Sequence, residues 1–466
     1  MYSVSQFAAR MSLACVVSLS LYACSDSDNT FNPNPAVSTL TINTVGSPEG
    51  MAGEMTRLVF RASLDVPQPE SVLIDYRTAA GTATAGVDYL DTLGNAEIPA
   101  GALAVEIPVE VFGDAEEELA ETLRLDFTAS DNVTVTDGSA TGYIANDDTA
   151  CETPYQKADP NRWRTSGADP LNYAHRGGVI DFPENTLYAY SEVAKLNDAI
   201  VLEMDVYQTA DNELVIIHDL DVDRTTNGTG LIADLTLAEL KQLDAAYWFV
   251  PGVGTPRDRP EADYVFRGIA TGERPPPPGY SAEDFQIPTL EEALARYPDR
   301  LLNLELKPDL DGEGNYETQM ANLLSAYGRF DDVIAASFVD EAANNFKAVA
   351  PCVHTSVPLG QGTFLVLGSQ GDNPLPPVPE HVAFQVPPDT TQISQIPDDV
   401  FIQVVTEDFV RDAHNANLAV QVWTINRCEE MLAMIELGVD AIMTDRPVLL
   451  QALLDQPRGS RSCEGL

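Results

Sequence analysis

Between residues 172 and 454, short runs rich in Val and Ile alternate with segments of helical periodicity. The helical segments span residues 187–196, 237–243, 318–327, 341–349 and 429–437. Such alternation favours parallel strands joined by crossover helices. A length of about 280 residues suits a (β/α)8 barrel, which typically has about 250 residues, with room for insertions. We therefore predict an α/β barrel of this type.

One strand-like run, residues 199–206, carries two acidic residues among apolar ones. Alternate residues of a strand face the same way, so Glu203 and Asp205 project together. Burying both would cost free energy unless a cation or partner compensates. The same spacing recurs at Glu305 and Lys307. We predict a site for a hard cation with Glu305 as a third oxygen ligand and Lys307 as a phosphate contact.

Two histidines stand beside these runs, at His175 and His218. Cleavage of a phosphodiester needs a base, an acid and cations that hold the developing charge. Histidine titrates near neutral pH and can serve as either acid or base, and Arg176 offers a fork of donors to phosphate oxygens. A single histidine is more often structural, but the combination predicts a phosphodiesterase site.

A series of ordered motifs resembles the glycerophosphodiester phosphodiesterase family. They are 174–178 (AHRGG), 184–186 (ENT), 203–205 (EMD), 215–219 (VIIHD), 288–292 (PTLEE), 305–307 (ELK), 422–426 (VWTIN) and 440–447 (DAIMTDRP). The resemblance covers roughly residues 172–454 and implies the same barrel fold.

The resemblance also implies a set of site residues and a reaction. The implied set comprises the acid and base His175 and His218, the cation ligands Glu203, Asp205 and Glu305, the phosphate contacts Arg176 and Lys307, and the pocket residue Trp423. A glycerol hydroxyl next to the phosphoester would attack phosphorus to give a cyclic phosphate, and water would open it to glycerol 3-phosphate. Which histidine acts first as base stays open. The divalent cation is expected to be Ca²⁺ rather than Mg²⁺, because the ligands are oxygens and the site is exported.

Two alternatives keep other functions open. The same site could act on lysophospholipids or phosphoinositol headgroups, since the motifs define the phosphate chemistry and not the alcohol. Alternatively, the chain could be a calcium-binding surface interaction protein with an idle barrel, although the sequence names no protein partner. The intact set of histidines and carboxylates argues against an idle barrel.

The barrel pattern is interrupted at residues 246–286, which are rich in Pro and Gly and lack helical or strand periodicity. Long insertions in compact domains are usually covers, binding loops or disordered segments. We expect this insertion to cover the substrate; an outer flap without substrate contact is the alternative.

The first part of the chain, residues 37–150, has apolar-alternating runs separated by Gly, Pro and Asp. Runs at 39–42, 57–64, 71–77 and 105–111 predict an antiparallel β-sandwich. The motifs 76–83 (YRTAAGTA), 88–89 (DY), 99–101 (PAG), 114–121 (DAEEELAE) and 144–148 (IANDD) resemble a Calx-beta domain. That resemblance implies calcium ligands at Glu49, Asp88, Asp114, Glu118, Asp147 and Asp148; a spacer without calcium is the alternative. The catalytic barrel would occupy residues 151–466.

The amino terminus resembles a bacterial lipoprotein signal. An apolar run at residues 11–23 follows Arg10 and is too short to span a bilayer. A small residue precedes Cys24, which would then carry the lipid and anchor the protein to the cell envelope. Ordinary cleavage, giving a periplasmic or secreted protein, is the alternative. Residues 24–36 predict a flexible tether.

The charge balance excludes one class of partner. The net charge is -46, from 72 acidic and 26 basic residues. Nucleic-acid binding is therefore not expected, because no basic surface can replace phosphate counterions. An anionic small-molecule diester must instead be drawn in locally, by Arg176, Lys307 and a cation.

The cysteines point to an oxidising compartment. Without Cys15, which belongs to the signal, and Cys24, four remain: Cys151, Cys352, Cys428 and Cys463. Two disulfides are expected in an exported chain, with three possible pairings. We expect Cys151–Cys463 and Cys352–Cys428, because barrel termini often lie close together; free buried thiols are the alternative.

Overall fold

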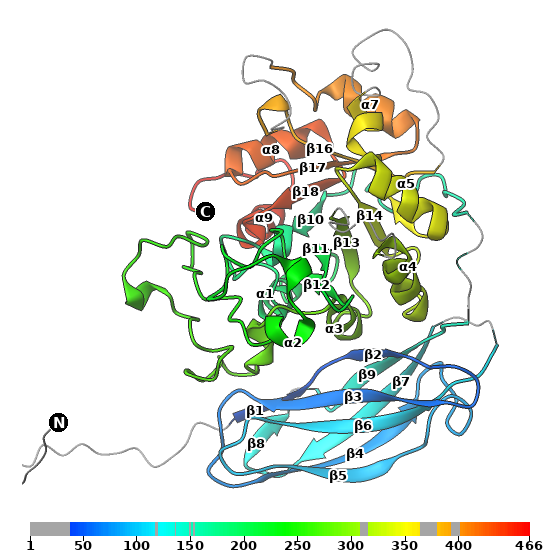
Figure 1. The fold of residues 1–466 in the computed structure, drawn as a ribbon, viewed down its shortest axis with the longest axis vertical. Helices are drawn as coiled ribbons and strands as arrows, with labels where there is room; N and C mark the ends of the chain where they lie inside the picture. Colours follow the sequence, from blue (N-terminus) through cyan, green and yellow to red (C-terminus); the bar gives the residue numbers. More distant parts are fainter. Residues whose placement is uncertain are drawn as a thin grey trace, which may run out of the picture. The chain divides into compact units, whose positions relative to one another are not determined.

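A computed structural model describes residues 38–116, 120–135, 137–148, 151, 154–307, 316–363, 380–392 and 401–466. These residues form an N-terminal β-domain and an α/β barrel (Figure 1). The predicted signal, the tether, Cys24 and Glu118 lie outside the described residues. Within those ranges, no helix is both long and apolar enough to cross a bilayer.

The N-terminal domain is a two-layered β-sandwich, as predicted. Its strands are β1 (Ser38–Ile42), β2 (Val45–Pro48), β3 (Met55–Leu64), β4 (Val72–Ala80), β5 (Leu93–Ile98), β6 (Ala104–Phe112), β7 (Glu121–Ala129), β8 (Val133–Val135) and β9 (Ser139–Ala145). One sheet has the order β6-β3-β1-β8 and the other β2-β9-β7-β4-β5. Alternating residues such as Leu58 and Phe60 of β3 are fully buried between the sheets, which is the pattern that the sequence carries.

The sandwich is not purely antiparallel. β1 pairs with β8, and β2 with β9, in parallel register. The first two strands belong to different sheets, β1 to one and β2 to the other. Each runs in the same direction as the late strand beside it, β8 or β9. The remaining strand pairs are antiparallel.

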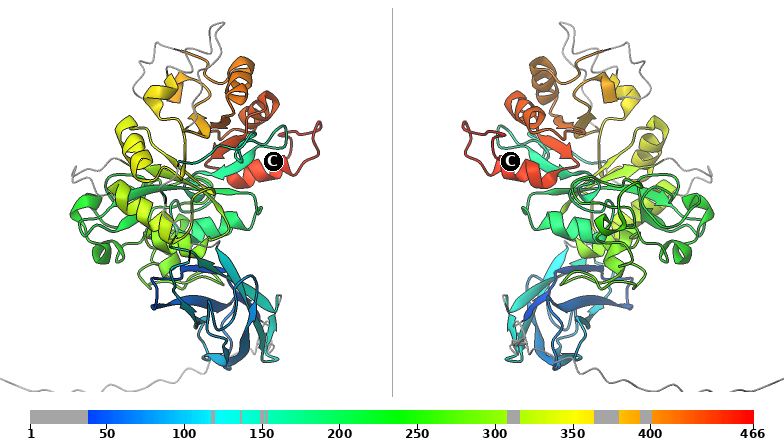
Figure 2. Two further views of the ribbon diagram at one scale, coloured as in Figure 1. Left: turned by 90° about the vertical axis from the view of Figure 1, so that its right-hand side faces the viewer. Right: turned by 90° about the vertical axis from the view of Figure 1, so that its left-hand side faces the viewer.

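The second domain is a barrel of parallel strands surrounded by helices (Figures 1 and 2). The strands follow the order β15 (His354–Thr355), β14 (Val333–Ala336), β13 (Leu301–Leu306), β11 (Val201–Gln208), β10 (Leu171–Ala174), β18 (Ala441–Thr444), β17 (Ala419–Val422) and β16 (Ala383–Val386). A parallel bridge between Ser356 and Ala383 joins the two ends of this order. The predicted (β/α)8 architecture is therefore confirmed.

Several helices of the barrel begin or end at residues that cap them. The helices among the described residues include α1 (Leu187–Ala194), α2 (Leu237–Leu240), α3 (Leu290–Arg296), α4 (Tyr316–Ala326), α5 (Asp340–Val349), α7 (Glu407–Asn415), α8 (Cys428–Leu437) and α9 (Pro447–Leu454). Thr289 and Glu292 form a capping box at the start of α3, and Gly438 ends α8 in the left-handed conformation. Each helical segment predicted from periodicity overlaps one of these helices.

The strand before His218 departs from the expected pattern. β12 (Leu214–Ile216) pairs antiparallel with β11, with Val206 opposite Ile216. The sequence predicts that the site residues follow barrel strands. His218 is an exception, because it follows this antiparallel strand. β11 extends far enough that the returning chain folds back as a hairpin and brings His218 to the same end of the barrel.

The two disulfides are present, but the predicted pairing is wrong. The bonds are Cys151–Cys352 and Cys428–Cys463, with Cα–Cα distances of 5.3 and 5.7 Å. The chain after Cys151 runs beside the turn that follows α5, where Tyr155 N donates to Pro351 O at 3.0 Å. The C-terminal segment instead returns to the first turn of α8. Cys151 is thus bonded to the turn after α5 and Cys463 to the first turn of α8, and the two are not bonded to each other.

The insertion packs beside α1 and does not line the substrate-sized cavity described below, among the residues that the structure describes. It contains two 3-10 turns, Glu261–Asp263 and Glu283–Phe285. Its aromatic residue Phe285 stacks on Tyr188 of α1, with ring centroids 4.7 Å apart. The insertion is therefore packed against α1 through its aromatic rings, and its role as a substrate cover stays a prediction.

A buried histidine in β15 makes the stability of the barrel sensitive to acid. The Nδ1 atom of His354 accepts a hydrogen bond from Trp163 Nε1 at 2.7 Å. Burial, assisted by Arg162 and Lys347, lowers the pKa of His354 to about 3. The unfolded pKa is about 6.5, so unfolding takes up a proton between these two values. Stability is fully present above pH 6.5 and falls as the pH drops toward 3.

Replacement of this histidine by glutamine, His354→Gln, removes the proton uptake. Urea unfolding at pH 7 and pH 5 should show that the wild-type protein loses about 2 kcal/mol more between the two pH values than the variant loses. Each protein is its own reference, so the cost of the substitution itself cancels. Equal losses in both proteins would show that His354 is not held neutral.

Candidate active site

The first part of the site is the turn that follows β10. His175 and Arg176 lie in a 3-10 turn in which Arg176 adopts a φ of +54°. The backbone N of Arg176 donates to Glu203 Oε2 at 2.8 Å. At Gly178, with a φ of +97°, an added Cβ would lie 2.8 Å from Pro447, so only glycine fits. This tight turn holds His175 and the Arg176 side chain over the end of β11.

Each of the two histidines is oriented by an aspartate. The Nδ1 atom of His175 lies 2.6 Å from Asp445 Oδ1, and that of His218 lies 2.6 Å from Asp219 Oδ1. Burial opposes ionisation of both aspartates, but the hydrogen bond to the histidine holds the pKa of each below its ordinary value. An ionised aspartate accepts from Nδ1, which leaves Nε2 as the ring nitrogen available for proton transfer.

The predicted cation ligands form one cluster. Asp205 of β11 is paired directly with Glu305 of β13, and Glu203 lies two residues before Asp205 on the same face. Oxygen atoms of the three carboxylates lie within 4.8 Å of one another. Glu203 and Asp205 are 1% and 0% exposed. The conclusion drawn from strand alternation, that these side chains project together, is confirmed.

The charges around this cluster are unequal. Burial, together with Asp205 and Glu305, raises the pKa of Glu203 well above its ordinary value. Burial would do the same to Asp205, but Lys307 and Arg176 hold its pKa well below the ordinary range. Lys307 Nζ lies 2.9 Å from Asp205 and 2.6 Å from Glu305. Three carboxylates thus face two basic side chains, Arg176 and Lys307, and their all-oxygen donors suit a hard divalent cation.

The site opens into a cavity of about 390 Å³. Its polar lining consists of His175, Arg176, Glu203, His218, Asn303, Glu305, Lys307, Ser337, Ser356, Gln385, Gln392 and Thr424, and its apolar lining of Ala336, Phe338, Val357, Leu359, Trp423 and Met443. Every residue predicted for the barrel site lines this cavity except Asp205, which is fully buried beneath it. Trp423 packs edge-to-face on Phe338, with ring centroids 5.3 Å apart.

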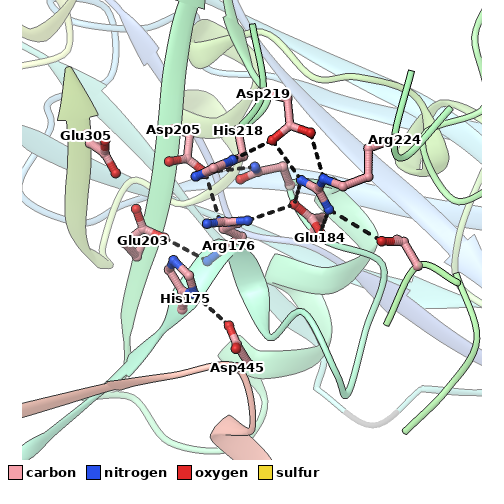
Figure 3. A network of polar contacts seen from close by, with 12 residues as sticks. His175, Arg176, Glu184, Glu203, Asp205, His218, Asp219, Arg224, Glu305 and Asp445 are labelled. Atoms are coloured by element: carbon pink, nitrogen blue, oxygen red, sulfur yellow. Dashed lines mark hydrogen bonds and ion pairs between the residues drawn. The ribbon is translucent and has the colours of Figure 1, made fainter. Parts of the chain in front are cut away.

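The sequence analysis assigned no function to several residues that the structure places at the site. Asp445 and Asp219, which hold the histidines, lie within the quoted motifs and could have been noticed as carboxylates near histidines. Glu184 also lies in a motif; it is buried and accepts hydrogen bonds from two arginines, Arg176 and Arg224 (Figure 3). Arg224 had no signal in the sequence, because only the loop after β12 brings it to the site.

Comparison with known proteins agrees with this geometry. The model of the glycerophosphoryl diester phosphodiesterase family matches residues 175–449. The chain belongs to this family. A glycerophosphodiester phosphodiesterase of Caldanaerobacter subterraneus is 31% identical over 60% of this chain and 96% of its own length. A protein of Bacillus subtilis named as a putative glycerophosphodiester phosphodiesterase is 29% identical over 59% of this chain and 93% of its own length.

A solved structure of a phosphodiesterase from Oleispira antarctica, in complex with the product sn-glycerol-3-phosphate, has 25% sequence identity and a TM-score of 0.45. The similarity covers 62% of this chain and 98% of that one. The Calx-beta family model matches residues 49–148, so the resemblance of the sandwich to Calx-beta domains is confirmed.

The sandwich of this family member brings together part of the predicted calcium set. Oxygen atoms of Glu49, Asp147 and Asp148 lie within 4.8 Å of one another. Burial and the charge of Asp148 raise the pKa of Asp147. One buried oxygen of each aspartate has no hydrogen-bond partner among the described residues. Asp88 and Asp114 are not in this group; their carboxylates accept hydrogen bonds from the backbone N–H groups of Thr84 and Glu116 respectively.

Neutralising one carboxylate of the barrel cluster should show separately how its charge affects stability and how it contributes to cation binding. In Glu203→Gln, the repulsion within the buried cluster is relieved, so the melting temperature measured in EDTA should equal or exceed that of the wild type. One ligand is also lost, so the rise in melting temperature on adding Ca²⁺ or Mg²⁺ should be smaller.

The matched control is Glu317→Gln, which changes a buried glutamate of α4 that does not line the cavity. This variant should keep the full cation-induced rise. The assignment of a cation site to the barrel cluster fails if Glu203→Gln keeps it as well.

Proposed function

We propose that this enzyme hydrolyses glycerophosphodiesters to glycerol 3-phosphate and an alcohol. The observation that carries the proposal is a cavity lined by two aspartate-held histidines, two carboxylates, an arginine and a lysine, with the third carboxylate, Asp205, buried beneath it. Acid, base and charge stabilisation are the components that phosphodiester cleavage requires. Family membership and the names of the two relatives support the same substrate class.

The first step would make a cyclic phosphate. One histidine takes the proton from the glycerol hydroxyl next to the phosphoester, and the oxygen of that hydroxyl bonds to phosphorus. The bond between phosphorus and the alcohol oxygen breaks, and the other histidine gives that oxygen a proton. The roles of His175 and His218 in this step are assigned only jointly, because each is oriented by its own aspartate, Asp445 and Asp219 respectively.

The second step would open the ring. Water adds to phosphorus after losing a proton to the histidine that is now unprotonated. The bond from phosphorus to the attacking glycerol oxygen breaks, and that oxygen takes a proton from the other histidine. Glycerol 3-phosphate results, and both histidines return to their starting states.

A divalent cation would be held by Glu203, Asp205 and Glu305, with Ca²⁺ proposed over Mg²⁺. Such an ion stabilises negative charge on phosphoryl oxygens. Arg176 and Lys307, which line the same cavity, would bind the remaining phosphate oxygens. These groups supply the local positive charge that an anionic diester needs in order to approach a protein with a net charge of -46.

Release of glycerol 3-phosphate from glycerophosphocholine tests the proposal. His175→Ala and His218→Ala should each lower kcat by about 10²- to 10⁴-fold, since each removes a proton-transfer group. EDTA should abolish activity, and adding back Ca²⁺ or Mg²⁺ separately should identify the cation.

The control is His414→Ala on α7, because His414 also pairs with a buried aspartate, at 2.8 Å from Asp440, outside the cavity. This variant should retain the wild-type kcat. Wild-type activity in either active-site variant would contradict the acid/base assignment, and activity that persists in EDTA would contradict the cation. Glycerophosphoinositol and lysophosphatidylcholine, assayed in parallel, would identify the preferred alcohol.

We also propose that the sandwich binds calcium at Glu49, Asp147 and Asp148. Calorimetric titration should be made in the Glu203→Gln background, so that the barrel cluster contributes less. Asp147→Asn should then abolish calcium binding, whereas Asp114→Asn should retain it, because Asp114 lies outside the trio. Binding that is equal in both variants would support the alternative of a spacer domain.

We propose further that the protein is exported and anchored to the cell envelope through a lipid on Cys24. The short apolar run at residues 11–23, which ends on a small residue directly before Cys24, supports this proposal. The disulfides Cys151–Cys352 and Cys428–Cys463 support an oxidising compartment.

A further inference from the structure

Arg224 connects two carboxylates of the active site, Asp219 and Glu184, that belong to different sequence motifs. Its Nε donates to Asp219 Oδ2 at 2.6 Å, and its Nη1 donates to Glu184 Oε2 at 2.6 Å. Its Nη2 bonds both carboxylates, at 2.8 Å to Glu184 and 3.2 Å to Asp219. Figure 3 shows the guanidinium between these two side chains. Both edges of the guanidinium are therefore used.

The two carboxylates lead to different functional groups. Asp219 holds His218 through Nδ1, as described above. Glu184 accepts from Arg176 Nη1 at 3.3 Å. A continuous path of charged hydrogen bonds thus runs from His218 through Asp219, Arg224 and Glu184 to Arg176, which links a proton-transfer group to a phosphate-binding group.

The inner end of this path is buried. The side chain of Glu184 is 2% exposed, and the bonds and charges of Arg224 and Arg176 overcome the effect of burial and lower its pKa. Asp219 is 29% exposed and Arg224 is 35% exposed, so the outer end of the path faces solvent. Thr255 of the insertion accepts from Arg224 Nη1 at 3.4 Å. Arg224 is consequently held by the buried Glu184 and by the insertion, and it holds the more exposed Asp219.

We propose that Arg224 is a positioning residue that orients His218 through Asp219 and sets the position of Arg176 through Glu184. This inference rests on the proposed phosphodiesterase function. Without Arg224, Asp219 loses the anchor that prevents it from rotating into solvent, so it leaves His218 Nδ1. Glu184 keeps only Arg176, which it then draws away from the substrate phosphate. The first effect acts on kcat and the second on KM.

Three variants test the role. Arg224→Gln should lower kcat on glycerophosphocholine about ten- to a hundredfold and raise KM, while the protein stays folded. Arg224→Lys should lose activity similarly, because one ammonium cannot replace paired bonds to two carboxylates. The control is Arg461→Gln, which breaks a paired contact to Asp169 outside the cavity and should leave kcat and KM unchanged. Full activity in Arg224→Lys would overturn the proposal.

A double-mutant cycle tests the connection itself. Asp219→Asn and Glu184→Gln should be non-additive in kcat/KM when Arg224 is present, by at least about threefold. The same two changes should be additive in the Arg224→Gln background, because the shared partner is gone. Additivity with Arg224 present would overturn the proposal, since it would mean that the two carboxylates act independently.

A crystal structure of Arg224→Gln keeps this test separate from the proposed function. We expect Asp219 to leave His218 Nδ1 and the Arg176 side chain to move toward Glu184. Unchanged positions of both groups would overturn the inference. A wild-type protein that hydrolyses no diester would overturn the proposed function alone, and the variant structure would still decide whether Arg224 positions these groups.

Discussion

The burial of three carboxylates at one end of the barrel is the constraint on which the rest of the site depends. Glu203, Asp205 and Glu305 come from two adjacent strands, so backbone pairing sets their spacing. Their mutual repulsion has to be balanced locally. Arg176 and Lys307 supply part of that balance, and a divalent cation would supply the remainder. The turn after β10 is built around the same need, because its backbone N–H binds Glu203.

The histidines are oriented by hydrogen bonds to two aspartates that do not belong to the carboxylate cluster. Asp445 follows the last barrel strand, whereas Asp219 follows a short antiparallel hairpin strand. The two histidines therefore have matching partners although they reach the cavity from different kinds of element. Arg224 then ties the hairpin side of the site to Arg176 through Glu184. In this arrangement the groups proposed for proton transfer and for phosphate binding share one hydrogen-bonded network.

Much of the fold and the core of the site could be predicted because they depend on local patterns. Alternation along β11 showed that Glu203 and Asp205 face one way, and periodicity located the helices. The partners of these groups could not be predicted in the same way. Arg224 lies in a loop without periodicity, and the partner of Cys151 depends on where the chain docks near α5. The packing of the insertion could not be predicted either, because a Pro- and Gly-rich composition does not reveal that Phe285 packs on Tyr188.

The sequence by itself determined the two-domain architecture, the family and the residue types that carry the chemistry, because strand and helix periodicities and short motifs are written in neighbouring residues. Only the tertiary structure decided how those residues are held. It paired His175 with Asp445, joined Asp219 to Glu184 through Arg224, and placed the insertion outside the cavity. These contacts join residues from separate loops and strands. Whether such residues lie close enough to interact depends on how the barrel closes and how its loops pack.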